Sequence, residues 1–161
     1  MVALRWLRVL LCACLVGASS GVWAETLYGV VIGIADGDTV TVLSMQQRQY
    51  KIRLAQIDAP ERKMPFGNRS RQHLADLVFK RSVRIEVEGI DKYGRTVGTI
   101  WLGKVDVNLE QVRSGLAWAY PAYLRDRNYL LVQQGARAAR RGLWVHKDPV
   151  PPWEWRHRKR R

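Results

Sequence analysis

The segment from residue 36 to residue 61 decides the fold. It opens with a turn and a strand, DGDTVTVL (36–43), and closes with an alternating stretch, QYKIRLAQI (49–57), that runs into DAPE. Asp-Gly-Asp favours a turn, and the β-branched residues of 26–34 before it favour a strand. Pro60 ends the third strand because it has no N–H for a ladder. Three successive strands with short connections predict an antiparallel meander.

Two further strands and three helices are predicted downstream. Alternating apolar residues in SVRIEVE (82–88) and β-branched residues in GRTVGTIWL (94–102) favour strands. Apolar spacing and capping residues predict helices over Asn68–Lys80, from Asp106 or Asn108 to Val112, and over Asp126–Arg141. The predicted class is mainly β with helices (α+β). Five short strands with helices between and after them fit a five-stranded oligonucleotide-binding barrel with three α-helices better than a parallel sheet.

The first 24 residues have the pattern of a removable signal peptide. Arg5 and Arg8 precede an apolar run at 9–16, and small residues stand at the expected cleavage site near Ala24. A membrane anchor is the weaker alternative because the run is shorter than the roughly 20 residues that span a bilayer. A lipid anchor in residues 11–14 is a third reading. Export to the periplasm or the medium is expected.

Three segments are therefore predicted: the signal peptide (1–24), a folded domain (25–147) and a C-terminal tail (148–161). Both cysteines, Cys12 and Cys14, lie in the first segment, so the exported domain would hold no disulfide. Three prolines in four residues begin PVPPWEWRHRKRR (149–161), and basic residues end it, which predicts a mobile tail.

The charge balance favours a polyanionic partner. The chain holds 27 Lys and Arg against 14 Asp and Glu, and without Arg5 and Arg8 the formal charge is +11. Such an excess suits nucleic acid, although solubility or attraction to anionic lipid explains it as well. The acidic residues carry more information about chemistry than the basic ones.

The sequence favours chemistry with a metal ion that oxygen atoms bind, rather than a zinc site or a serine or cysteine nucleophile. No cysteine follows residue 14, and His73, His146 and His157 lack a paired zinc-ligand spacing. His73 lies on a polar stretch of the predicted helix, where a solvated surface role is expected rather than that of a base for a serine or cysteine nucleophile.

Asp38 and Asp58 are the candidate metal ligands. Asp38 opens the second strand and Asp58 closes the third, so an antiparallel hairpin brings both to the same end of the sheet. Together with backbone carbonyls around Ala59, they would form a site for a hard cation, Ca²⁺ or Mg²⁺. The alternative is that these aspartates, with Asp36, are ordinary turn and strand-end residues.

Glu61, Arg53 and Arg95 favour the catalytic reading. Glu61 follows Pro60 just past the strand end, where it could accept a proton from an attacking water. Arg53 lies on the face opposite Leu54, expected to be the exterior of the barrel. With Arg95 it could clamp a phosphodiester and stabilise charge in the transition state. Surface ion pairs are the alternative role for each arginine.

The sequence resembles the staphylococcal nuclease (thermonuclease) family, in the form found among exported bacterial members. The likeness covers about residues 26–147 in the order of the family. Its motifs are DGDT (36–39), R-x-x-x-I-D-A-P-E (53–61), D-K-Y-G-R (91–95), V-N-L-x-x-V-x-x-G-L-A (107–117) and P-P-W-E-W-R (151–156).

The resemblance implies a Ca²⁺-dependent phosphodiesterase that cuts DNA and RNA, prefers single strands and leaves 3′-phosphate ends. Asp38 and Asp58 would be carboxylate ligands and Ala59 a carbonyl ligand, although the best-known member has threonine at the last position. Glu61 would be the general base. Arg53 and Arg95 would hold and polarise the phosphate.

The resemblance also implies a substrate-binding set. Lys92 and Tyr93 would bind a neighbouring phosphate, and Tyr120 and Tyr123 would stack on bases, although the spacing of this tyrosine pair departs from that of the best-known member. An equally good reading places the pair at the edge of the core beside Trp118. A monomer is expected.

Two other functions remain open from the sequence. A non-catalytic module of this fold would bind nucleic acid or act as a scaffold, and a basic envelope protein would coat polyanions without cleaving them. The presence of Glu61 and of both arginines favours the enzyme.

Overall fold

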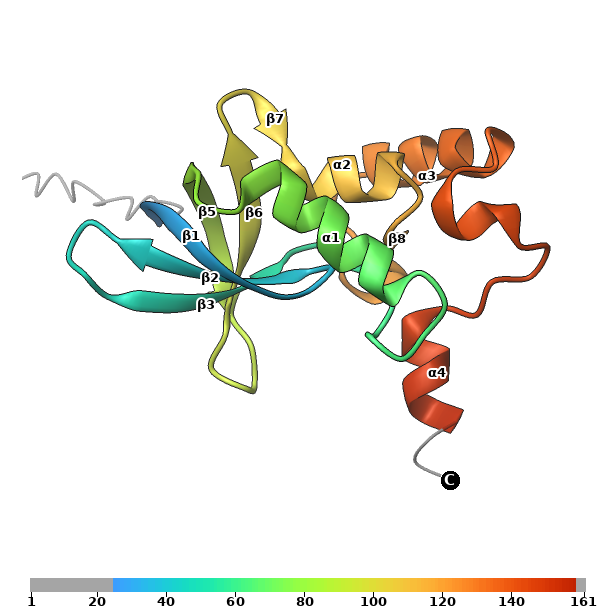
Figure 1. Ribbon diagram of the computed structural model, residues 1–161, viewed down its shortest axis with the longest axis horizontal. Coiled ribbons are helices and arrows are strands. Elements are labelled where there is room, and N and C mark those ends of the chain that lie inside the picture. Colours follow the sequence, from blue (N-terminus) through green and yellow to red (C-terminus); the bar gives the residue numbers. More distant parts are fainter. Residues whose placement is uncertain (1–24, 159–161) are drawn as a thin grey trace, which may run out of the picture.

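The computed structural model describes residues 25–158 and shows a closed β-barrel flanked by helices (Figure 1). The barrel strands are β1 (Thr26–Asp36), β2 (Thr39–Ser44), β3 (Gln49–Leu54), β5 (Ser82–Ile90) and β6 (Thr96–Leu102). They pair in the order β3-β2-β1-β5-β6, and β3 also pairs with β6, which closes the sheet. The predicted five-stranded oligonucleotide-binding barrel is therefore confirmed.

Side-chain alternation along β2 and β3 separates the core from the site. Val40, Val42, Ile52 and Leu54 are fully or almost fully buried and belong to the main hydrophobic core. The register pairs Thr39 with Arg53, so the end of β3 lies beside the start of β2. Irregular pairing between β1 and β2 near residue 36 marks the turn that leads into this end. The meander predicted from the sequence thus brings residues 36–39 next to residue 53.

Five short elements complete the fold. They are β4 (Ile57–Asp58), β7 (Val105–Asp106), β8 (Trp118–Ala119) and the 3₁₀ turns η1 (Pro121–Tyr123) and η2 (Gly142–Val145). β4 pairs antiparallel with β8, and this pairing sets Asp58 opposite Trp118. The prediction that Asp58 closes the third strand is therefore wrong, because β3 ends at Leu54 and Asp58 lies on a separate strand that is attached to the helical side of the molecule.

The three predicted helices are present, with bounds that differ from the predicted ones by up to three residues: α1 (Gly67–Val78), α2 (Val107–Arg113) and α3 (Asn128–Ala138). α1 runs across the barrel, packs against β1 and buries Leu74 and Val78 completely (Figure 1). Asp106 is the N-cap of α2, because its Oδ1 accepts the N–H of Leu109 at 2.9 Å.

Asn108 is a buried cross-link rather than a cap. Its Oδ1 accepts the N–H of Ile100 at 3.1 Å, and its Nδ2 donates to the carbonyls of Ala55 and Gly98, both at 3.1 Å. One amide therefore ties α2 to β6 and to the segment between β3 and β4. These bonds satisfy backbone groups that the barrel strands leave unpaired at this point.

A fourth helix, α4 (Pro152–Arg158), replaces the predicted mobile tail over those residues. Its Trp153 packs against a small cluster of Trp118, Ala136, Leu143 and Trp144. Trp118 meets Trp153 edge to face, with ring centroids 5.6 Å apart. The prolines at 149–152 thus lead into a docked helix, because the tryptophans provide an apolar surface that packs against the domain. The basic composition of the segment had suggested a mobile tail instead.

In residues 25–158, no helix is long and apolar enough to span a membrane. The predicted signal peptide lies outside the described residues, so it stays a prediction.

Candidate active site

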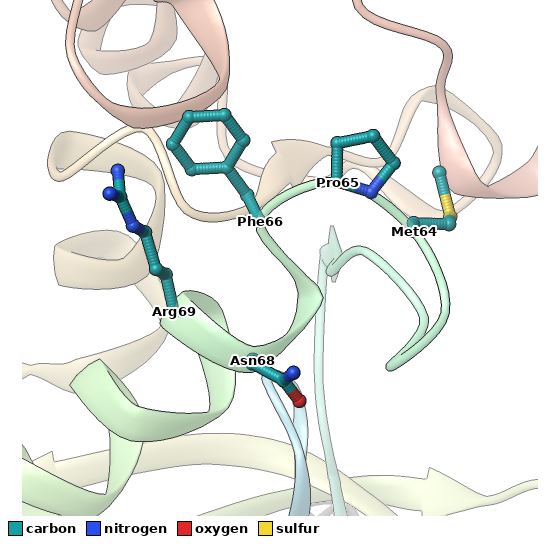
Figure 2. Close-up of a pocket in the computed structure, with 5 residues that line it drawn as sticks. All are labelled: Met64, Pro65, Phe66, Asn68 and Arg69. Atoms are coloured by element: carbon teal, nitrogen blue, oxygen red, sulfur yellow. The ribbon is translucent and has the colours of Figure 1, made fainter.

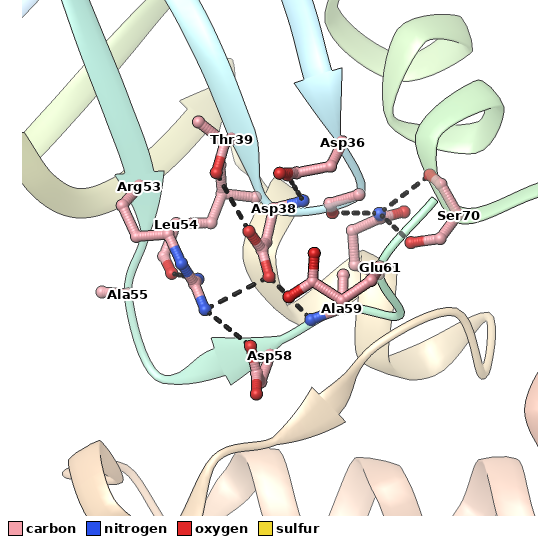
Figure 3. Close-up of polar contacts among 12 residues, drawn as sticks. Asp36, Asp38, Thr39, Arg53, Leu54, Ala55, Asp58, Ala59, Glu61 and Ser70 are labelled. Carbon is pink, nitrogen blue, oxygen red and sulfur yellow. Dashed lines mark hydrogen bonds and ion pairs between the residues drawn. The ribbon is translucent and has the colours of Figure 1, made fainter. Parts of the chain in front are cut away.

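Asp38 directly precedes β2, and three neighbours hold its side chain in one orientation (Figure 3). Its Oδ2 accepts the N–H of Ala59 at 2.7 Å and lies 3.2 Å from Nη2 of Arg53. Its Oδ1 accepts the hydroxyl of Thr39 at 3.1 Å. Asp36 shapes the turn, since its Oδ1 accepts the N–H of Asp38 at 3.1 Å. The carboxylate of Asp38 is therefore preorganised, and Asp36 has the role of a turn residue, as in the alternative interpretation of the sequence.

Gly37 lets the turn approach α1 closely. A Cβ at this position would overlap the Ser70 hydroxyl and crowd Cβ of Ala59. The Gly37 carbonyl accepts a hydrogen bond from Nε2 of Gln111 at 2.6 Å, and the same nitrogen donates to the carbonyl of Ser70 at 3.2 Å. Only a residue without a side chain fits here, so packing requires the glycine.

Asp58 forms the second half of the acidic pair. Its side chain is 2% exposed, and its Oδ1 accepts Nη2 of Arg53 at 3.0 Å. Burial raises the pKa of Asp58 to about 6, against the lowering effect of its hydrogen bond with Arg156, and the charge of Asp38 raises it further. Two buried carboxylates side by side repel each other when both are ionised, and a bound cation would relieve this repulsion.

Arg53 lies between the two aspartates rather than on an open exterior face. Its side chain is 14% exposed, its Nη2 contacts Asp38 and Asp58, and its Nη1 donates to the carbonyl of Leu54 at 2.6 Å. The alternation that placed it opposite Leu54 was correct. Its partners show that this face forms the site end of the barrel.

Glu61 stands at the rim of the same site. Its side chain is 44% exposed, and Nη1 of Arg156 lies 3.1 Å from its Oε1. A tight loop fixes its backbone, because the N–H of Met64 donates to the Glu61 carbonyl at 2.8 Å. The adjoining loop and the start of α1 border a pocket of about 300 Å³ (Figure 2). Glu61 is thus accessible to solvent and anchored, as a base must be.

The residues present fit a hard cation in donor type. Over residues 25–158, no group of three His, Cys, Asp or Glu side chains is arranged to hold a metal ion. Two carboxylates do converge, because a single nitrogen of Arg53 lies 3.2 Å from Asp38 and 3.0 Å from Asp58. Ca²⁺ and Mg²⁺ take carboxylate, carbonyl and water oxygens. The Ala59 carbonyl and water would have to complete such a site.

Arg95 is engaged elsewhere. Its Nε donates to Oδ2 of Asp91 at 2.7 Å, and its guanidinium lies 5.5 Å from the ring centre of Tyr93. Lys92 also lies over the Tyr93 ring, at 5.1 Å. Lys92, Tyr93 and Arg95 therefore form one cluster at the β5–β6 turn, and the contacts of Arg95 in this structure are not with the aspartate pair.

Arg95 lies near β3 in the barrel. β3 and β6 run parallel with Arg53 opposite Val97, and Arg95 directly precedes β6. The β5–β6 turn therefore lies beside β3, the strand that contains Arg53.

Tyr120 and Tyr123 differ in their availability. Tyr120 stacks on Trp153 of α4 with ring centroids 5.2 Å apart and planes at 9°, so one of its faces is covered. Tyr123 meets Tyr120 edge to face and is 66% exposed. The structure places Tyr123 where an aromatic ring is open to a ligand. Tyr120 has the core-edge contacts of the alternative reading.

Residues 51–146 match the sequence profile of staphylococcal nuclease homologues. The chain belongs to the staphylococcal nuclease family. Within that family it is 38% identical over 165 residues to a micrococcal nuclease of Shigella flexneri, and the match covers 96% of this chain and 94% of that protein. It is 42% identical over 130 residues to an uncharacterized endonuclease of Haemophilus influenzae, covering 81% and 73% of the two chains. The Escherichia coli protein ParB is 42% identical over 149 residues, covering 86% and 83%.

Family membership makes nucleic acid the substrate class of this nuclease and makes its reaction hydrolytic.

Sequence reasoning missed several residues that the structure brings to the site. His73 contacts Gln111 through Nδ1 and Ser114 through Nε2, the latter at 3.1 Å, so it links α1 to α2 instead of being solvated. Gln111 in turn holds the Gly37 turn.

Arg156 is the most consequential of the missed residues. Its Nη2 lies 2.7 Å from Oδ2 of Asp58, and its Nη1 lies 3.3 Å from Oδ1 of Asp58. The one signal that pointed to it was its place in the P-P-W-E-W-R motif, which the basic composition of the segment masked.

Proposed function

We propose that this nuclease is a Ca²⁺-dependent phosphodiesterase that cleaves DNA and RNA, prefers single strands and leaves 3′-phosphate ends. The observation that carries the proposal is the contact of Arg53 with both Asp38 and Asp58 at the barrel end that also holds Glu61. A carboxylate pair that can hold a cation, an accessible carboxylate that can act as a base and a guanidinium that can bind the phosphate are together sufficient for hydrolysis of a phosphodiester.

Glu61 is the proposed general base. Its exposed carboxylate would take a proton from water as the oxygen forms a bond to phosphorus. The bond between phosphorus and the O5′ oxygen then breaks, and O5′ takes up a proton from solvent. The phosphate stays on the 3′ side, so the products are a 3′-phosphate and a 5′-hydroxyl.

Arg53 is the proposed electrostatic partner of the phosphate. A guanidinium has five N–H donors, so Arg53 can hold Asp58 and still donate to a phosphoryl oxygen. Its low exposure strengthens this interaction relative to one in water. Arg95 would join it from the β5–β6 turn once it leaves Asp91.

The cation would be held by Asp38, Asp58 and the carbonyl of Ala59, and when bound it would supply positive charge at the phosphate. All three donors are oxygen, which supports Ca²⁺ or Mg²⁺ over zinc. The resemblance to thermonucleases favours Ca²⁺.

Single strands are the proposed preferred substrate because unpaired bases can stack on aromatic rings. Tyr123 is 66% exposed and supports this preference. Lys92 and Tyr93, at the β5–β6 turn, are the proposed contacts of a neighbouring phosphate.

We also infer that the protein is exported and acts as a monomer. The charge and apolar pattern of residues 5–16 supports export. An exported domain without cysteines relies on its core, and the barrel core described above is continuous.

A digest of plasmid, single-stranded DNA and RNA in Ca²⁺, in Mg²⁺ and in chelator tests the proposal. Cleavage is expected in Ca²⁺ and none in chelator, with single strands cut faster than duplex and the products carrying 3′-phosphate. Full cleavage in chelator would contradict the role of the cation, and binding without cleavage in all three buffers would indicate a non-catalytic module.

A further inference from the structure

Helix α4 brings a guanidinium to the catalytic residues. Arg156 contacts Asp58 at 2.7 Å and Glu61 at 3.1 Å, and its own side chain is 37% exposed. We propose that Arg156 is a substrate-binding residue of this nuclease, a guanidinium that binds the phosphodiester beside Glu61. The proposal rests on the nuclease function set out above and extends its active site to the C-terminal helix.

The helix is fixed well enough to place Arg156. Trp153 stacks on Tyr120 at 5.2 Å and meets Trp118 edge to face at 5.6 Å, while Pro152 is buried. Arg156 lies three residues beyond Trp153, which in a helix is nearly one turn. The aromatic contacts therefore anchor the first turn and set where the guanidinium lies. Little ordering of Arg156 remains to be done when substrate binds.

The surroundings of Arg156 suit a nucleotide. A cleft of about 440 Å³ is lined by Ala35, Asp36, Glu61, Arg62, Lys63, Trp155 and Arg156. Three of these side chains are cationic and two are acidic, so the lining has an excess of positive charge that suits a phosphate. Glu61, the proposed base, lines the same cleft. A phosphodiester bound there would lie between Arg156 and Glu61.

The charge balance of the cluster explains why Arg156 contacts carboxylates in this structure. Asp38, Asp58 and Glu61 carry three negative charges when ionised, and Arg53 and Arg156 carry two positive charges. A divalent cation held by the aspartates would change this balance to one positive charge, which would favour an anionic phosphodiester. Arg156 could then exchange Asp58 for a phosphoryl oxygen, because that carboxylate would have the cation as its partner.

Binding of a nucleoside 3′,5′-bisphosphate, measured by calorimetry on the full mature chain in Ca²⁺, tests this role. This probe carries a base and phosphates but no internucleotide bond, so it is not consumed. Arg156→Gln is expected to weaken binding about 10-fold to 100-fold, the size of a lost charge-assisted contact. Arg156→Lys is expected to restore part of the loss, because it returns the charge without the bidentate geometry.

Arg158→Gln is the matched control. Arg158 is on the same helix, is 68% exposed and pairs with Glu154 at 3.8 Å, so its loss should change affinity less than about 2-fold. In cleavage assays the Arg156→Gln change should raise KM far more than it lowers kcat. Thermal unfolding of each variant shows whether α4 and the barrel remain folded.

Equal bisphosphate affinity in Arg156→Gln and Arg158→Gln would overturn the proposal. So would tighter Ca²⁺ binding by Arg156→Gln with unchanged bisphosphate affinity, because Arg156 would then be only a counterion of the aspartates. Failure of the proposed function is distinct, since it would appear as wild-type protein that does not cleave.

Discussion

Arg53 donates a hydrogen bond from Nη2 to Oδ1 of Asp58 at 3.0 Å, and the same nitrogen lies 3.2 Å from Oδ2 of Asp38. A single guanidinium group thus bridges the two carboxylates proposed to hold the cation. Asp38 directly precedes β2 and Asp58 ends β4, so this bridge joins the start of the β2–β3 hairpin to the segment that follows it.

Replacement of Arg53 by Gln is expected to lower kcat about 100-fold or more at saturating Ca²⁺. The reason is the loss of a poorly exposed donor to the phosphate, and donors of this kind typically contribute that much. Single-turnover cleavage of a short DNA strand measures it. Arg84→Gln is the matched control, because Arg84 pairs with Glu86 on β5 and the site residues are elsewhere. Similar loss in both variants would contradict a specific role for Arg53.

Asp36 makes the stability of the protein depend on pH. Burial, followed by the charge of Asp38, raises the pKa of Asp36 from 3.8 to about 6. The folded state therefore binds this proton more tightly than the unfolded state, and the residue's ionisation opposes folding above about pH 6. This cost disappears as the pH falls through 6 toward 4.

Asp36→Asn is expected to be more stable than the wild type by about 1–2 kcal/mol at pH 7.5, and equal to it near pH 4. The asparagine oxygen can still accept the N–H of Asp38. Urea unfolding in chelator at both pH values measures the difference. The exposed Asp76→Asn provides a control with an expected change below about 0.5 kcal/mol. A variant that is less stable than the wild type at pH 7.5 would show that the negative charge supports the turn.

Asn108→Ala is expected to destabilise the fold by about 2–4 kcal/mol. The side-chain amide of Asn108 is fully buried and makes hydrogen bonds with one backbone N–H and two backbone carbonyls. Its removal leaves these groups unsatisfied. Chemical unfolding measures the loss, with the exposed Asn68→Ala as the control of the same residue type. A loss below 1 kcal/mol would mean that water replaces the amide.

The local pattern of the sequence predicted the elements that depend on near neighbours. Strand alternation and the Asp-Gly-Asp turn placed Asp38 beside Arg53, because the register of the β2–β3 hairpin determines that outcome. Asp58 lies beyond this hairpin, on β4, so its contact with Arg53 also depends on the pairing of β4 with β8. The roles of the site residues as ligands, base and phosphate clamp remain predictions.

Contacts between distant parts of the chain could not be predicted in this way. Arg156 meets Asp58 across 98 residues, and Gln111 meets Gly37 across 74. Such pairs depend on how the helices dock onto the barrel, which periodicity does not report. The C-terminal segment was misread for a related reason: its prolines and basic residues suggested a mobile tail, whereas the stack of Trp153 on Tyr120 docks it.

The central claim is that Glu61 is the base of a hydrolytic site at this end of the barrel. Cleavage of single-stranded DNA in Ca²⁺ by Glu61→Gln, compared with wild type and with Glu110→Gln, tests it most directly. Glu110 is on α2 and pairs with Arg113, so its variant should cleave at close to the wild-type rate. Glu61→Gln is expected to lose about 100-fold to 10,000-fold in kcat. Cleavage by Glu61→Gln at the wild-type rate would contradict the account.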